Sequence, residues 1–153
     1  MSVWAVVPIR ALWGGKSRLA PLLEPAERAA LSACLLGGVL RALRAVPALA
    51  RIVVISPDAT VRALVEPLGA EALPDPAPAH RADEDQGSLN AALDHASTRA
   101  AAAGASSVLV LPADLPLARP DDIHAVLMAL PPPPSVVLVP TADGGTGALL
   151  RMP

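Results

Sequence analysis

Residues 5–19 read AVVPIRALWGGKSRL, and this stretch decides the fold and the search for a site. It begins within an apolar run of β character, 3–9, and continues into a loop with three cations, Arg10, Lys16 and Arg18. A strand that ends in a glycine-containing cationic loop presents backbone N–H groups and positive charge to a ligand. We therefore expect this loop to bind a polyanion, and a nucleoside triphosphate is the polyanion that we favour.

Lys16 is the only lysine in the chain, whereas eleven arginines carry the remaining positive charge. The loop therefore keeps a compact point charge where the rest of the chain uses the planar guanidinium. One alternative is a solvated surface turn, as most loops are. A P-loop is a poor match, because its first glycine would fall at Arg10 and Pro21 would interrupt the helix that must follow.

Length and composition predict one domain, 1–153, that buries a single core. The residues are 53% hydrophobic and 17% charged, and the net charge is −2. The chain therefore lacks the excess of basic residues that would indicate a nucleic-acid partner. Trp4 and Trp13 are the only aromatic residues, which leaves the core to aliphatic side chains. The single cysteine, Cys34, excludes an internal disulfide, and we expect it to be buried within a helix.

The sequence offers no targeting or membrane-spanning segment. The first residues lack a charged region followed by an unbroken apolar run, and no run reaches about 18 apolar residues. We therefore expect a cytoplasmic protein with no membrane partner.

Hydrophobic periodicity predicts strands and helices in alternation. Strands are expected at 3–9, 51–56, 70–73, 107–111, 136–139 and 148–152, and helices at 25–46, 57–67, 89–103 and 120–130. Ser56 and Ser88 are expected to cap the second and third helices. Residues 74–85 are expected to form a mobile surface loop with His80 exposed to solvent. This pattern is typical of an α/β sandwich with a mainly parallel sheet.

Ligands of such sheets bind beyond the carboxyl ends of the strands. That rule gathers four segments on one rim: Lys16, the helix start 88–90, Asp114 and the loop 144–146. Asp114 follows a buried strand between two prolines, so its carboxylate is a candidate ligand for Mg²⁺, although it could also only cap the turn.

Two further positions have both a structural and a functional interpretation. Asn90 lies in a first helical turn, where capping is as common as ligand contact. The loop with Gly145 and Thr146 is either an ordinary tight turn or a place where backbone amides and a hydroxyl approach a phosphate or carboxylate.

Six motifs, in order, resemble the family of 2-phospho-L-lactate or phosphoenolpyruvate guanylyltransferases of deazaflavin coenzyme F-420 biosynthesis. They are VVPIR, GGKSRLAPLL, IVVISPD, GSLNAAL, VLVLPADLPL and DGGTGALL, and the resemblance extends over nearly the whole chain. The resemblance implies a Rossmann-like three-layer sandwich of the nucleotidyltransferase type, with a mixed, mainly parallel sheet. It also implies an enzyme that transfers GMP from GTP to a small phospho-acid and releases pyrophosphate.

The resemblance also implies roles for individual residues. Lys16 and Arg18 would neutralise the triphosphate, and Asp114 would hold Mg²⁺. The GTP contacts would be Pro8, Arg10, Lys16, Gly87, Leu89 and Asn90, and the phospho-acid contacts would be Gly145 and Thr146. No covalent nucleophile is needed, since positioning and charge stabilisation carry such a reaction.

The chain departs from the family pattern in three places. Arg10 and Gly147 replace a lysine and an asparagine, and the family continues beyond Pro153 with a further strand and a second metal-binding aspartate. We therefore expect a short member with weak or no turnover, and an exposed sheet edge that favours a homodimer.

Two other functions stay open from the sequence. One is an impaired homologue that only binds nucleotide or protein. The other is a molybdopterin- or sugar-type nucleotidyltransferase, although their LAGGxGxRxG loop is replaced here by VPIRALWGGKSRL.

Overall fold

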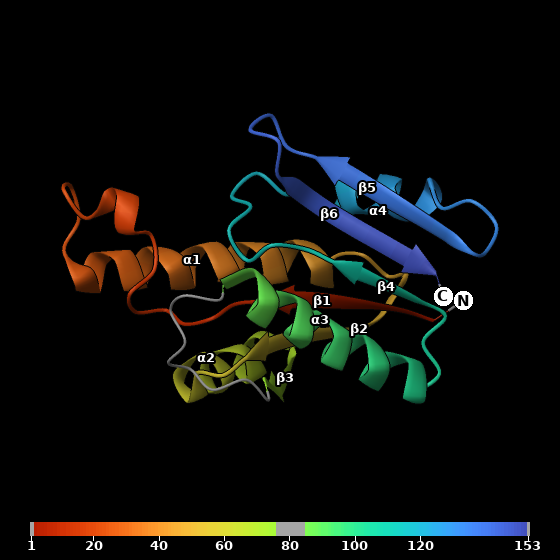
Figure 1. The fold of residues 1–153 in the computed structure, drawn as a ribbon, viewed down its shortest axis with the longest axis horizontal. Coiled ribbons are helices and arrows are strands. Elements are labelled where there is room, and N and C mark those ends of the chain that lie inside the picture. The colour runs from red at the N-terminus through yellow and green to blue at the C-terminus, as the bar shows by residue number, and fades with distance from the viewer. Residues whose placement is uncertain (1, 76–84, 153) are drawn as a thin grey trace.

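The chain folds around a six-stranded mixed sheet with helices on both faces (Figure 1). The computed structural model describes residues 2–75 and 85–152. The strand order is β3-β2-β1-β4-β6-β5, and five of the six strands run in one direction. The α/β sandwich with a mainly parallel, mixed sheet, which the sequence predicts, is confirmed.

The first strand, β1 (Val3–Pro8), lies at the centre of the sheet. It pairs in parallel with β2 (Leu49–Ser56) on one side and β4 (Ser107–Val110) on the other, and β3 (Glu71–Pro74) extends the sheet beyond β2. Five of the six residues of β1 are buried, because helices cover both of its faces. The apolar run before the cationic loop is therefore the middle of the core.

The last strand, β6 (Thr146–Met152), is inserted between β4 and β5 (Ser135–Pro140) and runs antiparallel to both. Since β5 runs in the same direction as β4, the turn from β5 to β6 lies at the carboxyl edge of the parallel strands. The loop that carries Gly145 and Thr146 is thereby brought to the same edge as the loops after β1 and β4.

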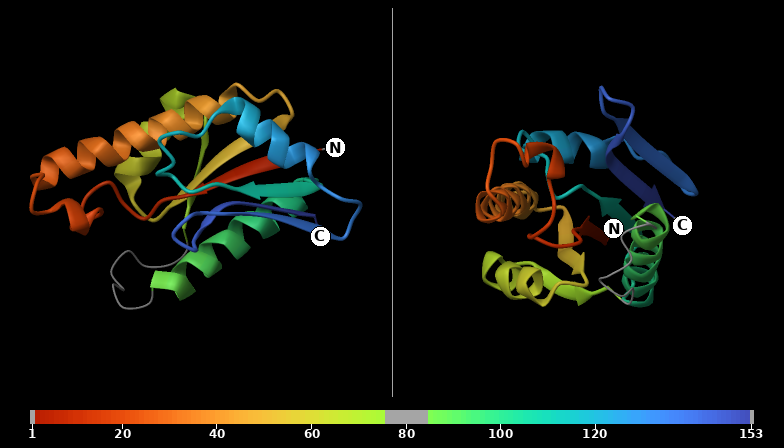
Figure 2. Two further views of the ribbon diagram at one scale, coloured as in Figure 1. Left: turned by 90° about the horizontal axis from the view of Figure 1, so that it is seen from above. Right: turned by 60° about the vertical axis from the view of Figure 1, so that its left-hand side comes forward.

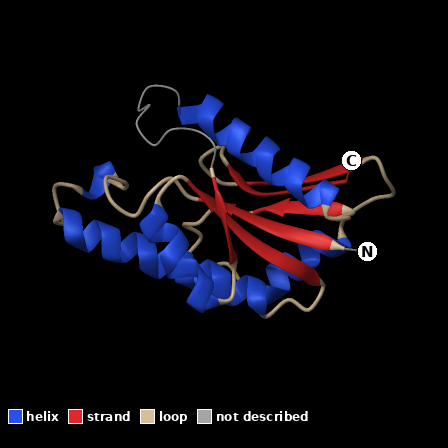
Figure 3. Ribbon diagram, turned by 90° about the horizontal axis from the view of Figure 1, so that it is seen from below, coloured by secondary structure: helices blue, strands red, loops and turns tan. Residues whose placement is uncertain are grey.

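The helices divide unequally between the two faces. Figure 2 shows α1 (Pro25–Arg44), α2 (Ala59–Val65) and α4 (Pro120–Met128) on one side of the sheet and α3 (Asp85–Ala102) on the other. The larger core cluster joins the three helices to the sheet, and the smaller one joins alanines of α3 to Trp4 and its neighbours. The sheet therefore lies between two helical layers, as Figure 3 also shows. None of the helices in the described ranges is long and apolar enough to cross a membrane.

Several local predictions are wrong. The second helix is capped by Asp58, whose carboxylate accepts from the Thr60 N–H at 2.8 Å, whereas the Ser56 hydroxyl bonds the Arg10 carbonyl. The third helix begins at Asp85, so Ser88 lies inside its first turn. Cys34 is exposed, because it lies on the outer side of α1.

The remaining helix and strand boundaries agree with the predicted ones to within a few residues. The second helix is shorter than predicted. The helix that was expected to reach residue 67 ends at Val65 and is followed by a short 3-10 helix, η2 (Glu66–Leu68). The predicted loop 74–85, with His80, falls mostly outside the described residues, which resume at Asp85.

Candidate functional site

A cleft of about 500 Å³ opens at the carboxyl edge of the sheet, between the loops that follow β1 and β4. It includes five of the residues that the sequence analysis assigns to a site: Pro8, Lys16, Leu89, Asp114 and Thr146. The other lining residues are Ile9, Ala11, Gly15, Ser32, Leu93, Val110, Pro112, Ala113 and Leu149. The chain thus brings the ends of three strands and the start of α3 to one cavity.

Lys16 holds an uncommon backbone conformation at the turn of the cationic loop. Its φ is 53° and its ψ is 42°, in the left-handed region, and it is the only non-glycine residue with positive φ in the described ranges. Such a conformation costs a β-carbon-bearing residue on the order of 1–3 kcal/mol and is held by its surroundings. Here Lys16 precedes the 3-10 helix η1 (Ser17–Leu19), and its carbonyl accepts from the Leu19 N–H at 2.9 Å. The tight turn therefore fixes the backbone from which the side chain extends.

The Lys16 ammonium lies 3.2 Å from the Asp114 carboxylate, although the two residues are 98 positions apart. Asp114 lies in the loop after β4, between Pro112 and Pro116. The side chains are 21% and 60% exposed, so solvent reaches the carboxylate more easily than the ammonium. Ion pairs of this exposure contribute only about 0–1 kcal/mol to folding. A ligand that offers each group a better partner can therefore replace this pairing.

One part of the cleft wall is apolar. Ile9, Leu93, Val110 and Leu149 line it, and Leu89 is 43% exposed at its edge. Leu93 and Leu149 were not among the residues predicted for the site, because apolar residues at helical or strand spacing are typical of a hydrophobic core. Leu149 lies three residues after Thr146 in the sequence. This spacing would have indicated Leu149 only if the antiparallel position of β6 had been known.

Ser32 is a second residue that the sequence analysis did not assign. It lies on α1, is 8% exposed, and lines the cleft. Its hydroxyl donates to the Arg28 carbonyl one turn earlier at 2.9 Å. Its donor is therefore already used within the helix.

Arg10 lies beside the cleft rather than in it. It lines a neighbouring depression of about 250 Å³, which shares Pro8 and Leu89 with the cleft and also includes Asp75. The Arg10 carbonyl accepts from the Ser56 hydroxyl at 3.2 Å. The two hollows are therefore continuous along the start of α3.

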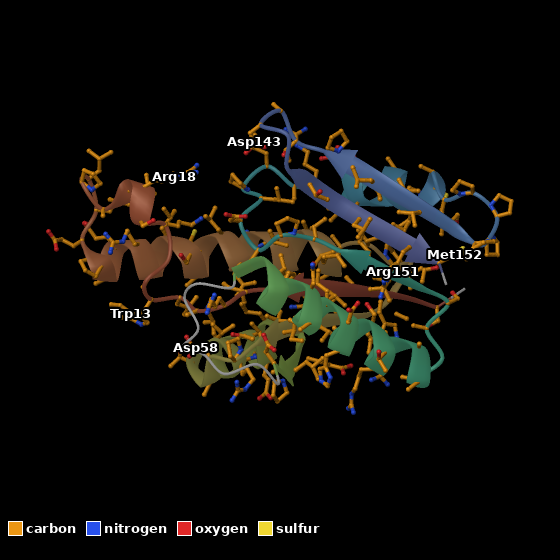
Figure 4. All side chains as sticks on the ribbon, viewed as in Figure 1. Trp13, Arg18, Asp58, Asp143, Arg151 and Met152 are labelled. Carbon is orange, nitrogen blue, oxygen red and sulfur yellow. The ribbon has the colours of Figure 1, made fainter. Side chains whose placement is uncertain are left out.

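Besides Arg10, three described site residues, Arg18, Asn90 and Gly145, do not line the cleft. Gly87 and Asn90 lie in the first two turns of α3, and Asn90 is exposed. Gly145 adjoins Thr146 but contributes no wall, and Arg18 is exposed on η1. Figure 4 shows Arg18 on the same side of the molecule as Asp143, the aspartate of the β5–β6 turn.

The β5–β6 turn is ordered by Asp143. Its carboxylate accepts from the Thr141 hydroxyl and, at 3.2 Å, from the Gly145 N–H. These hydrogen bonds hold the pKa of Asp143 below its usual value, and the bond from the Thr141 hydroxyl has the largest effect. The positive charge of Arg18 lowers this pKa further. A β-carbon at Gly145 would lie 2.8 Å from the Thr141 hydroxyl oxygen, so this position requires glycine. The turn therefore presents Thr146 from a defined backbone.

The donor set fits a magnesium ion that shares its ligands with a substrate. Among the side chains that the structure describes, no three of His, Cys, Asp or Glu gather as a metal-binding group. Asp114, however, offers an accessible hard oxygen in the cleft. Mg²⁺ commonly keeps several waters and takes one or two carboxylates together with substrate phosphates.

Comparison with known proteins places the chain in a family. Residues 22–152 match the MobA-like NTP transferase domain. A phosphoenolpyruvate guanylyltransferase of Rubrobacter xylanophilus is 42% identical over 154 residues, which cover 100% of this chain and 70% of that protein. One of Nocardia farcinica is 39% identical, over 97% of this chain and 64% of that protein. A 3-phospho-D-glycerate guanylyltransferase of Phenylobacterium zucineum is 36% identical, over 95% and 64%. This chain thus spans about two thirds of the length of these relatives.

Solved structures agree on the fold. A nucleotide-diphospho-sugar transferase from Desulfovibrio desulfuricans G20 superposes with a TM-score of 0.75 at 16% identity, over 99% of this chain and 64% of that one. A CMP:2-keto-3-deoxy-manno-octonic acid synthetase in complex with CTP superposes with a TM-score of 0.60 at 19% identity, over 99% of this chain and 74% of that one.

The domain match and the sequence identity to these relatives decide the family. The chain belongs to the MobA-like NTP transferase family and to the phosphoenolpyruvate guanylyltransferase family.

Proposed function

We propose that this chain forms a single guanylyltransferase domain, 1–153, that transfers GMP from GTP to a small phospho-acid. A phosphate oxygen of the phospho-acid attacks the α-phosphorus of GTP. The bond from that phosphorus to the oxygen that bridges it to the β-phosphate breaks, and pyrophosphate leaves with the electron pair. The acceptor is phosphoenolpyruvate, 2-phospho-L-lactate or 3-phospho-D-glycerate, and the first and last of these are named in the relatives.

The observation that carries this proposal is the meeting of Lys16 and Asp114, 3.2 Å apart, in the cleft beyond the sheet. Two polyanions must approach each other in such a reaction, and charge builds up on the leaving pyrophosphate. Lys16 is placed to neutralise phosphate oxygens. Asp114 is placed to hold Mg²⁺, which when bound supplies positive charge to the phosphates.

The remaining cleft residues divide between the two substrates. The apolar wall with Leu89 is suited to the nucleoside, and Pro8 and Arg10 border it. The Thr146 hydroxyl, at the start of β6, is suited to the phospho-acid. We propose that Arg18, Asn90 and Gly145 act from the rim, because they do not line the cleft. We also propose that Gly87, in the first turn of α3, lies near the nucleoside.

This assignment has consequences for the biological setting. The product, in which a small acid is joined to guanosine through a diphosphate, is the activated precursor that deazaflavin coenzyme F-420 biosynthesis requires. Its substrates, GTP and a phospho-acid, are water-soluble metabolites. We therefore propose a cytoplasmic role in that synthesis, with GTP as co-substrate and Mg²⁺ as cofactor.

The test is nucleotide binding followed by turnover. The melting temperature is measured with GTP, CTP and ATP, each with Mg²⁺, because a ligand that binds only the folded state raises it. We expect GTP to raise it most. Pyrophosphate release from GTP is expected to be weak or absent, as for a short member, and any release should depend on an added phospho-acid. A larger rise in melting temperature with CTP would favour a cytidylyltransferase. No rise with any of the three nucleotides would contradict the proposal.

We also propose that the chain forms a homodimer through β5. This edge strand carries no charge, and its Val136 and Leu138 are 60% and 55% exposed. The opposite edge, β3, is short, and its Glu71 is paired with Arg51 across 3.2 Å. Charged, short edges resist pairing, whereas an uncharged one accepts a second copy of itself.

The oligomeric state tests this association directly. We expect light scattering to give twice the chain mass, and Val136→Lys to give the chain mass. Leu117→Lys adds the same charge at another exposed apolar residue, outside β5, and is expected to leave the dimer intact. A wild-type chain that stays monomeric at all concentrations would contradict the proposal.

A further inference from the structure

Lys16 and Asp114 neutralise each other in the cleft, although each charge is suited to a different part of a metal-bound nucleotide. Among the described residues that line the cleft, they are the only charged side chains. The ammonium lies 3.2 Å from the carboxylate, so the two charges of the described lining offset each other where a ligand would enter. A free nucleotide therefore meets a cation that is already occupied and a carboxylate that repels phosphate.

We propose that Asp114 makes the cleft selective for the metal complex of the nucleotide over free nucleotide, by occupying Lys16 until a cation takes its carboxylate. This inference rests on the proposed function. A metal-bound triphosphate brings a cation for Asp114 and phosphate oxygens for Lys16. The two side chains then exchange partners, and no charge is left unpaired during the exchange.

The exposure of the pair supports this exchange. The Asp114 side chain is 60% exposed, so a hydrated cation reaches its oxygens without displacing protein atoms. Lys16 is only 21% exposed, and its backbone is fixed by the turn into η1. Its flexible four-carbon stem nevertheless lets the ammonium move between partners, which a planar, bidentate guanidinium would do less readily. This accounts for a lysine here in a chain that otherwise uses arginine.

Calorimetry of GTP binding with Mg²⁺ and with EDTA tests the inference. We expect the wild type to bind GTP much more weakly in EDTA. Asp114→Asn is expected to bind GTP about tenfold more tightly than the wild type in EDTA, as for removal of one unit charge close to a phosphate and release of Lys16. It is also expected to lose most of the advantage of Mg²⁺. Asp121→Asn removes the same charge from α4, outside the cleft lining, and is expected to keep the wild-type ratio.

The double variant separates pair exchange from simple repulsion. In a Lys16→Met background, Asp114→Asn is expected to improve binding in EDTA much less than it does with Lys16 present. An equal improvement in both backgrounds, or none in either, would overturn the inference while leaving the proposed function standing. A wild type that binds no GTP under either condition would overturn both.

The single lysine gives a second readout that does not depend on affinity. In protein labelled with ¹³C-lysine, the one side-chain ε-methylene signal belongs to Lys16. We expect Mg²⁺ alone to shift this signal toward the position that it has in Asp114→Asn, and GTP with Mg²⁺ to shift it further. A signal that neither addition moves would contradict the exchange. Unfolding curves check that each variant is folded.

Discussion

Replacement of Leu89 by alanine isolates the nucleoside half of the cleft from its charged half. Leu89 lines both the cleft and the depression beside it, and it is 43% exposed in the free protein. Full burial of a leucine side chain contributes about 1.5–3 kcal/mol. If a bound nucleoside covers the exposed 43%, the lost contribution is about 0.6–1.3 kcal/mol. That corresponds to a roughly three- to ninefold weaker affinity for GTP.

The substitution has a modest effect on the folded state. The buried 57% of the side chain (100% − 43%) contributes about 0.9–1.7 kcal/mol by the same proportion, and the higher helix propensity of alanine offsets a small part of this loss. We therefore expect Leu89→Ala to lower the free energy of unfolding by about 1–2 kcal/mol and to remain folded. A loss above about 3 kcal/mol would mean that Leu89 is part of the core and not of a binding surface.

The assay compares two ligands, Mg–GTP and Mg–tripolyphosphate, by calorimetry. Leu89→Ala is expected to weaken the first and leave the second unchanged, because tripolyphosphate has no nucleoside to contact the apolar wall. Leu22→Ala, at a leucine that is 80% exposed and does not line the cleft, serves as the matched control. Equal weakening of both ligands, or of neither, would refute the placement of the nucleoside.

Three further outcomes are expected. Leu150→Ala, at a fully buried residue of β6, should cost about 2–5 kcal/mol of unfolding free energy in urea titrations. Gly145→Ala should displace the Thr141 hydroxyl, 2.8 Å from the new β-carbon, and weaken phospho-acid binding without changing GTP affinity in calorimetry. The lowered pKa of Asp143 means that its carboxylate stabilises the β5–β6 turn above the ordinary aspartate pKa. This contribution should disappear as the pH falls through the lowered pKa, which a carboxyl NMR titration checks; a raised pKa would contradict it.

The meeting of Lys16 and Asp114 follows from the sequence because of a topological rule. Each residue lies in the loop that follows an apolar run of β character, and the carboxyl ends of parallel strands share one edge of a sheet. Residues 98 positions apart are thus brought together without any knowledge of the loops. Their distance and relative exposure could not be predicted, because these depend on how each loop closes.

Loop geometry accounts for most of the other differences. Nothing in the sequence indicates that Lys16 takes the left-handed conformation next to two glycines that tolerate it better. The serine expected to cap α2 bonds a carbonyl from another loop, so Asp58 takes its place. Such choices depend on which partners the tertiary structure supplies.

The sequence by itself determined the order of strands and helices, the burial of β1 and the edge of the sheet at which the cleft lies. These follow from periodicity and from the chirality and direction of βα units, which are local properties. Only the tertiary structure decided that β6 lies antiparallel between β4 and β5, and so brought Thr146 and Leu149 into the cleft. The physical reason is that a short apolar strand is compatible with several neighbours, and the neighbour is selected by the packing of the whole sheet against its helices.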